Sequence, residues 1–357
     1  MTGRTAMRQA PAVAFAACAA VAGGPATAAD PVAVYNWSAY AAEDALAAFE
    51  RETGMPLRYE TYGEGGVAET RLGARGSGYD VAVVSSEYLR RLIRAGALKP
   101  LAVEAPSDLY PMVMERLAPL DPDHVFALPY FWGMTGIAVD TAALAARAPD
   151  APADSWSLLF DPAYVSRFTD CGVALLDSPE ESVAAALLWL GLDPDSEAPE
   201  DVAAAIDALA AVAPHVTHFT SEHVELLEEG AVCLAMTWNT DLAEAGDRYA
   251  FITPTEGALL WVDVFVMPVD APNPEGGRRF IETMLRPEIS ALNTNAVLAA
   301  NAVSAATAML DAAVRDDPTI YPPADKMARL VTLRGRDPEA KRAVARAWTR
   351  LKLGMPN

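Results

Sequence analysis

The chain has 357 residues, of which 52% are hydrophobic, and a formal net charge of -21 at pH 7. A chain of this length and composition can bury a large core, and we expect two lobes instead of one large domain. The excess of acidic residues would repel phosphate, so neither nucleic acid nor an anionic membrane is expected as a partner. Because an acidic surface also aids solubility, the charge alone does not identify a cationic ligand.

The first 28 residues have the pattern of an export signal. Arg4 and Arg8 precede an apolar run from Ala10 to about Gly23, and Ala26-Thr27-Ala28 has the small-x-small form of a signal-peptidase site. We therefore predict a signal peptide over residues 1–28 and an exported mature chain. No later apolar stretch in the sequence is long enough to span a bilayer.

The chain has three cysteines. Cys18 could carry a lipid anchor, but Phe15 suits a lipobox poorly, so we favour its removal with the signal peptide. Cys171 and Cys233 then remain, and an even pair in an exported protein suggests a disulfide. Two free buried thiols are the alternative.

The N-terminal part predicts strands that end in polar and aromatic residues. A strand over Pro31–Trp37 brings Trp37 and Tyr40 to the place where the sheet ends, and ligands bind beyond such strand ends in open α/β sheets. A helix over 43–53 and a strand over 55–61 follow. A buried strand over 79–84 then ends in Ser85-Ser86-Glu87, before a helix, and forms a second predicted binding edge.

The segments 126–133 and 136–139 predict a strand that passes from one lobe into the other. A further strand over 171–177 leads into a helix that begins after Ser178. With Pro179 at its first position, Glu181 is the third residue of this helix and could complete a capping box. That local role is the alternative to a ligand contact for Glu181.

Two later strands end in, or contain, an aromatic residue and an acid. The strand over 231–237 leads to Trp238 and Asp241, and the strand over 259–267 carries Asp263 inside an apolar run. A buried acid is costly unless it is paired. The aromatic residues (Trp37, Tyr40, Trp238, Trp261, Tyr321) and the acids (Glu181, Asp241, Asp263) have almost no Lys, Arg or His beside them in the sequence.

This combination suits an aliphatic amine. Aromatic rings provide flat walls for methylene groups and a cation–π attraction of about 0.5 to 2 kcal/mol each, and carboxylates meet the ammonium ends. A dication would also offset the cost of burying the acids.

Four segments resemble the periplasmic polyamine-binding proteins of ABC importers, most closely the putrescine-binding type. They are Tyr-Asn-Trp-Ser at 35–38, Leu-Asp-Ser-Pro-Glu-Glu at 176–181, Asp-Val-Phe-Val-Met-Pro at 263–268 and Ile-Tyr-Pro-Pro-Ala-Asp at 320–325. The resemblance extends over nearly the whole mature chain. It implies an α/β two-lobe periplasmic-binding-protein fold of type II, with mixed sheets flanked by helices and a ligand cleft between the lobes. It further implies a periplasmic location, putrescine, spermidine or a related polyamine as ligand, and a permease in the inner membrane as partner.

The same resemblance implies a disulfide between Cys171 and Cys233. It assigns ligand contacts to Trp37, Ser38, Tyr40, Ser85, Glu181, Trp238, Asp241, Trp261, Asp263 and Tyr321. One departure is Ala39, where the family usually has an aspartate. We hypothesise that Glu87 replaces the missing charge, the alternative being a solvent-facing acid in the first turn of its helix.

For the domain organisation we predict four segments after the signal peptide. Residues 29–135 and 256–310 form the first lobe, and residues 136–255 and 311–357 form the second. Crossings between the lobes are expected near 133–137 and 253–258, with a third near 310. We expect a monomer without cofactor or bound metal.

The sequence is compatible with two other functions. Glu181 and Asp241 could be the acid pair of a secreted carbohydrate-active hydrolase, although we predict that the protein is not an enzyme. It could also be an amine sensor that is not coupled to transport. His215, His218 and His223 together with Cys233 do not have the spacing of a zinc site, and a solvated loop is the better interpretation.

Overall fold

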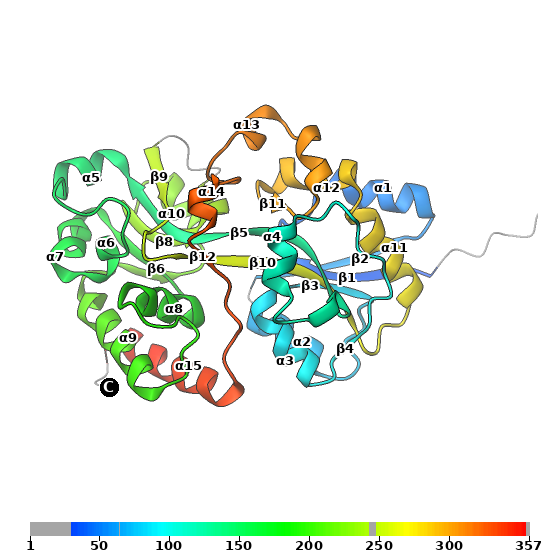
Figure 1. Cartoon of the computed structure of the whole chain (residues 1–357), viewed down its shortest axis with the longest axis horizontal. Coiled ribbons are helices and arrows are strands. Elements are labelled where there is room, and N and C mark those ends of the chain that lie inside the picture. The colour runs from blue at the N-terminus through cyan, green and yellow to red at the C-terminus, as the bar shows by residue number, and fades with distance from the viewer. Residues whose placement is uncertain (1–29, 64, 243–247, 355–357) are drawn as a thin grey trace, which may run out of the picture.

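The computed structural model describes residues 30–63, 65–242 and 248–354. Two lobes lie side by side, and a mixed sheet of twelve strands runs through both in the order β2-β1-β3-β10-β5-β8-β6-β7, with four short strands beside this path (Figure 1). The predicted α/β class with mixed sheets flanked by helices is confirmed. None of the described helices is long and apolar enough to cross a membrane. The predicted signal peptide and Cys18 lie outside the described residues.

The first lobe is built on three parallel strands with β1 in the middle. Val32 and Val34 of β1 face one hydrophobic cluster, whereas Ala33 and Tyr35 face another, as the alternation of the sequence predicts. The elements of this lobe are β1 (Val32–Trp37), α1 (Glu43–Thr53), β2 (Leu57–Tyr62), α2 (Gly65–Gly73), β3 (Val81–Ser85), α3 (Ser86–Arg94), β4 (Leu98–Lys99), α4 (Pro111–Leu117), α11 (Pro274–Met284), α12 (Pro287–Val297) and β11 (Ala300–Asn301).

Strands β5 (Ala127–Asp140) and β10 (Ala258–Pro268) join the two lobes (Figure 1). The two predicted segments form one continuous strand from Ala127 to Asp140, and all 14 of its residues are buried. It pairs antiparallel with β10 on one side and with β8 (Leu234–Trp238) on the other. The register with β10 shifts after Asp263, where the next pair is Val264 with Pro129. A proline cannot donate to a sheet, and an irregularity is where a central strand tolerates one.

The second lobe surrounds a core in which the large side chains Trp156, Phe160 and Phe168 are fully buried. Its central strands are β8, β6 and β7, which are parallel to one another. The remaining elements of this lobe are α5 (Thr141–Arg147), α6 (Ser157–Phe160), α7 (Pro162–Val165), β6 (Val173–Leu176), α8 (Pro179–Trp189), α9 (Pro199–Val212), β7 (His218–Thr220), α10 (Val224–Glu228) and β9 (Tyr249–Ile252).

The C-terminal segment contacts both lobes. It contains α13 (Ala312–Arg315), α14 (Ala324–Met327), β12 (Leu330–Val331) and α15 (Pro338–Lys352). Val314 and Ile320 pack into a first-lobe cluster, whereas Val344 and Trp348 of α15 pack into the second-lobe core. These contacts favour a last lobe boundary near 330 instead of 310, and the boundaries stay predictions.

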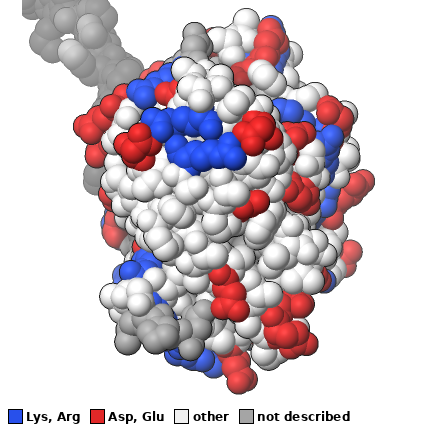
Figure 2. All heavy atoms as spheres, turned by 90° about the vertical axis from the view of Figure 1, so that its left-hand side faces the viewer, with Lys and Arg blue, Asp and Glu red and all other residues white. Residues whose placement is uncertain are grey.

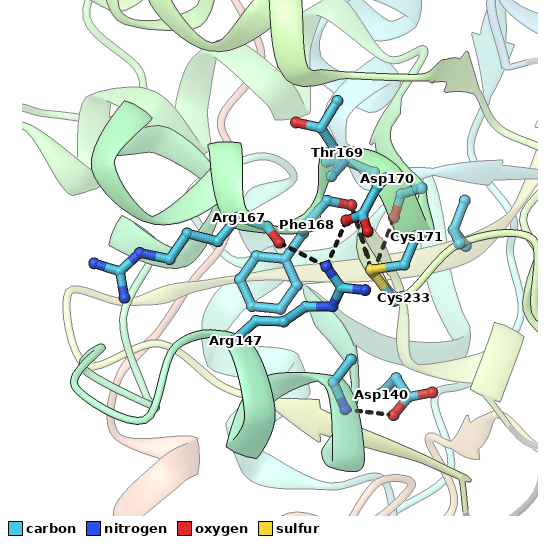
Figure 3. Close-up of a disulfide and its surroundings, with 12 residues drawn as sticks. Asp140, Arg147, Arg167, Phe168, Thr169, Asp170, Cys171 and Cys233 are labelled. Carbon is cyan, nitrogen blue, oxygen red and sulfur yellow. Dashed lines mark hydrogen bonds and ion pairs between the residues drawn. A yellow bond between two sulfur atoms is a disulfide. The ribbon is translucent and has the colours of Figure 1, made fainter.

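A disulfide joins Cys171 and Cys233, with a Cα–Cα distance of 5.6 Å, which confirms the predicted pair. It links the short helix Ser166–Cys171 to the residue before β8. Figure 3 shows Arg147 beside it, directed at Asp170 and at the carbonyl of Arg167. The bond thereby fixes the beginning of the strand that ends in Trp238.

The outer face of the second lobe intermixes acidic and basic side chains around a broad uncharged area (Figure 2). Arg147 pairs with Asp170, and Arg167 with Asp150, through acids that are largely exposed. Solvent screens such surface pairs, so they contribute little to stability. The excess negative charge of the chain is therefore not concentrated on this face. The acids of the candidate site, described below, are a separate feature.

We predict that protein lacking residues 1–28 has no free thiol under denaturing, non-reducing conditions. Reduction should lower the unfolding temperature, because releasing a bond across a sequence separation of 62 residues restores entropy to the unfolded chain. In the chain-entropy model this costs about 4 kcal/mol. A thiol titration and calorimetry with and without reductant measure both effects. Two titratable thiols per chain would contradict the prediction.

Candidate functional site

Strand β5 aligns the predicted site residues of its two neighbouring strands. Gly133 lies opposite Trp261 of β10, Phe131 lies opposite Asp263, and Thr135 lies opposite Trp238 of β8. Three candidates from two different strands thus meet along five residues of β5. This place is also where β5 passes from the first lobe to the second.

Gly133 is the residue that lets these side chains approach the strand. A Cβ atom at this position would lie 2.1 Å from Cζ2 of Trp261 and 2.5 Å from Oδ1 of Asn239. Asn239 is fixed on both sides, since it accepts from the Met134 N–H at 2.7 Å and donates to the Thr319 carbonyl at 3.0 Å. The Trp261 ring is therefore held against the backbone of β5.

Asp263 is the acid on the first-lobe side of the site, and its residue is only 6% exposed. The Tyr40 hydroxyl donates to its Oδ2 at 2.7 Å, and Ser85 is its partner in the pairing of β3 with β10. Burial raises the pKa of Asp263 to about 7, which the Tyr40 hydrogen bond opposes and the charge of Glu181 reinforces. Asp263 is thus a buried carboxyl that would gain from a nearby cation.

Two further candidates lie at the end of β1, next to Ala39. The Trp37 ring packs against Tyr62 with a centroid distance of 4.5 Å, and the exposed Ser38 donates to the Tyr62 carbonyl at 3.3 Å. Ala39 is exposed and has a φ of 53°. This left-handed conformation suits aspartate or asparagine better than alanine. The backbone therefore retains a shape that the missing aspartate would fit.

Glu181 does not form the capping box that was the alternative to a ligand contact. Ser178 makes no side-chain cap hydrogen bond at the start of α8. The Glu181 carboxylate instead accepts from the Thr135 hydroxyl, and from the Trp238 indole at 3.2 Å. Burial raises its pKa, and these hydrogen bonds oppose the rise. Glu181 is therefore oriented by residues of the two strands at the junction of the lobes, and the local capping role is wrong.

Asp241 is the second acid on this side. The Thr237 hydroxyl donates to its Oδ2, and burial raises its pKa to about 6 against the effect of that bond, with a smaller contribution from Glu181. His223 lies beside it, with its Nδ1 3.8 Å from Oδ2 of Asp241. Since His223 is fully buried, its assignment to a solvated loop is wrong.

Glu87 is partly buried and is not a solvent-facing acid. Burial raises its pKa to about 7, and the charges of Glu181 and Glu180 on the other lobe contribute. Arg91 follows one turn later on α3 but forms a two-pronged pair with Glu69, at 2.6 and 3.3 Å. Arg91, which could pair with Glu87 along the helix, is therefore already bound to Glu69.

Four acids share one electrostatic property. Within the described ranges, none of them forms an ion pair with lysine or arginine: Glu87, Glu181, Asp241 and Asp263. The buried Arg336 is bound to Glu180 at 2.7 Å and so does not neutralise them. The charge of Glu181 raises the pKa of each of the other three acids, so all three are close enough to it to interact. A site of this kind can hold a ligand with more than one positive charge.

Within the described residues, Tyr321 makes no hydrogen bond to these acids. Its hydroxyl accepts from Nδ2 of Asn301 at 3.0 Å, and its ring meets Trp132 edge-on at 6.1 Å. These contacts anchor it to the first-lobe side of β5 and β11. Its predicted ligand contact stays a prediction.

Comparison with known proteins identifies the family of this chain. The model of the family described as bacterial extracellular solute-binding protein matches residues 44–322. The chain belongs to this family. It is 38% identical to the putrescine-binding periplasmic protein PotF of Escherichia coli K12, over 90% of this chain and 91% of that protein. It is 37% identical to the putrescine-binding periplasmic protein SpuD of Pseudomonas aeruginosa, again over 90% and 91%.

Solved structures confirm the type II fold of this solute-binding protein. The spermidine/putrescine substrate-binding protein PotD of Streptococcus pneumoniae has a TM-score of 0.77 at 24% identity, covering 91% of this chain and 99% of that one. The Tp0655 lipoprotein of Treponema pallidum has a TM-score of 0.76 at 22% identity, covering 91% and 100%. At these identities the likeness establishes the fold.

Four residues of the site were not predicted from the sequence. Thr135, Thr237 and Asn239 orient the acids and Trp261, and His223 contacts Asp241. The two threonines had a detectable signal, because each is a hydroxyl inside an apolar strand and must find a partner when buried. Among the described residues, no group of three or more His, Cys, Asp or Glu side chains could hold a metal ion.

We predict that the ligand-free protein is more stable at pH 5.5 than at pH 8. Burial raises the pKa of Asp263 and Glu87 to about 7 and that of Asp241 to about 6. An acid whose pKa is higher in the folded than in the unfolded state contributes stability that is present at low pH and lost as the pH rises through the folded pKa. Burial lowers the pKa of His223 to about 4, and this single group opposes the gain below about pH 6.5.

Differential scanning calorimetry of ligand-free protein between pH 5.5 and 8 measures this dependence. The double variant Asp263→Asn, Glu87→Gln should have a flatter profile, because it lacks two acids whose pKa burial raises to about 7. A parent protein that unfolds at a higher temperature at pH 8 than at pH 5.5 would contradict the prediction.

Proposed function

We propose that this solute-binding protein captures putrescine or a related polyamine in the periplasm and delivers it to the permease of an ABC importer. The observation that carries the proposal is the set of four acids without a lysine or arginine partner, gathered with Trp238 and Trp261 at the junction of the lobes. The names of PotF and SpuD, which are putrescine-binding proteins, support the same ligand class.

The residues divide between two ammonium groups. Asp263, held by Tyr40, receives one end of the amine, and Glu181 and Asp241 receive the other. The rings of Trp37, Trp238, Trp261 and Tyr321 cover the methylene chain, and Ser38 and Ser85 complete the first-lobe end. The ligand supplies the cation that the buried acids lack, so binding offsets the cost of their burial.

Capture requires the lobes to close around the amine. Each of the ligand's ends contacts a different lobe, since Asp263 and Tyr40 pack with the first lobe and Glu181 and Asp241 with the second. A ligand that holds both lobes favours the closed arrangement by its differential affinity for it. The permease then recognises the closed protein. The protein acts as a monomer and performs no covalent chemistry.

The hydrolase alternative uses the same acids. Glu181 and Asp241 would act on a glycosidic bond, and the tryptophans would stack on sugar rings. Incubation of the protein with glycans and calorimetric titration with putrescine separate the two functions. Mass spectrometry of small molecules retained through purification identifies the natural amine.

We predict that Asp263→Asn and Trp238→Ala each weaken putrescine binding at least about tenfold, which corresponds to about 1.4 kcal/mol. The first removes a charge partner and the second removes a wall and a hydrogen-bond donor to Glu181. Isothermal titration calorimetry gives the dissociation constants. Asp150→Asn is the matched control, because its side chain is 61% exposed and it loses the same charge. Parent-like binding by folded variants would remove the site assignment.

We also predict that Glu87→Gln weakens the binding of di- and polyamines by about 1.5 to 3 kcal/mol, as expected for a charged hydrogen bond. Ala39→Asp should restore much of this loss, since the left-handed backbone at Ala39 accommodates aspartate. Glu339→Gln serves as control because Glu339 is an exposed acid in the first turn of α15. If Glu87→Gln binds every tested amine like the parent, Glu87 has no part in recognition.

A further inference from the structure

His223 is a fully buried imidazole that the fold leaves without a hydrogen bond. Neither ring nitrogen has a partner within the described part of the chain. The residue precedes α10, yet its side chain makes no cap hydrogen bond to that helix. A buried donor or acceptor without a partner costs free energy, which packing an apolar side chain in its place would avoid. Folding alone therefore does not explain a histidine here.

The imidazole approaches the Asp241 carboxylate. Nδ1 of His223 lies 3.8 Å from Oδ2 of Asp241, the oxygen that also accepts from the Thr237 hydroxyl. A movement of less than about 1 Å would bring Nδ1 and Oδ2 within hydrogen-bond distance. The second oxygen of Asp241 would then stay free for a ligand.

The charge state of the imidazole suits this task. Burial lowers the pKa of His223 to about 4, and His218 contributes to the shift, so the ring is neutral near pH 7. A neutral donor orients a carboxylate without cancelling its charge, whereas lysine or arginine at this position would compete with a cationic ligand. The charge of Glu181 also acts on Asp241, but Glu181 is an acid and does not neutralise it.

We propose that His223 is a positioning residue, which donates from Nδ1 to Oδ2 of Asp241 when an ammonium group occupies the site. The bond fixes the carboxylate so that Oδ1 faces the ligand. This inference rests on the proposed function, because it takes Asp241 to be the amine-binding acid of the second lobe. In this role His223 contacts the Asp241 carboxylate and not the ligand.

The test compares His223→Met with His223→Gln by titration with putrescine and by thermal unfolding. His223→Met fills the space without a donor, so it should weaken putrescine binding about tenfold while the unfolding temperature of the ligand-free protein stays the same or rises. His223→Gln keeps a donor and should bind within about threefold of the parent. A purely structural histidine would instead lose stability and keep its affinity. Parent-like binding by His223→Met overturns the proposal.

A spectroscopic measurement on the parent protein does not depend on the folding of any variant. In NMR spectra of ¹⁵N-labelled protein, putrescine should shift the Nδ1 resonance of His223 and slow the exchange of its proton. An unchanged resonance in saturated protein overturns the proposal.

Asp241→Asn separates this inference from the proposed function. If Asp241→Asn weakens putrescine binding but His223→Met does not, only the positioning role fails. If Asp241→Asn binds putrescine like the parent, the second-lobe end of the proposed site fails, and the role of His223 fails with it.

Discussion

The antiparallel pairing of β5 with β10 is the constraint on which the rest of the structure depends. Both strands run from one lobe to the other, and their register places Trp261 beside Gly133 and Asp263 beside Phe131. Because backbone hydrogen bonds set this register, a shift of one residue would turn every side chain to the opposite face. The lobes and the site are therefore positioned by the same ladder of bonds.

A second constraint is electrostatic. Cations are present near the site, but they are engaged: Arg336 binds Glu180, and Arg91 binds Glu69. Glu181 and Asp263 are left with hydroxyl and indole donors, which orient a carboxylate without neutralising it. Such an arrangement is unfavourable for the empty protein. Proteins retain costs of this kind at functional sites, where a ligand offsets them.

Hydroxyl and amide side chains form the layer behind the acids. The Thr135 hydroxyl donates to Glu181, and the Thr237 hydroxyl donates to Asp241. Asn239 hydrogen-bonds both to β5 and to the segment before α14. Each is short and anchored on a strand or directly after one, so the acids that the two threonines contact have few alternative orientations. This supporting layer gives the site its geometry, whereas the acids and tryptophans give it its chemistry.

The sequence by itself determined the α/β class, the cysteine pair, the strand-end positions of Trp37 and Trp238, the position of Asp263 inside an apolar strand, and the scarcity of cations beside the acids in the chain. These features follow from local periodicity and composition. Only the tertiary structure decided that Glu181 turns to Thr135 and Trp238 instead of capping its own helix, and that His223 is buried against Asp241. Local pattern could not settle the first question, because the deciding partners lie 46 and 57 residues from Glu181 in the chain and come together only when β5 pairs with β8.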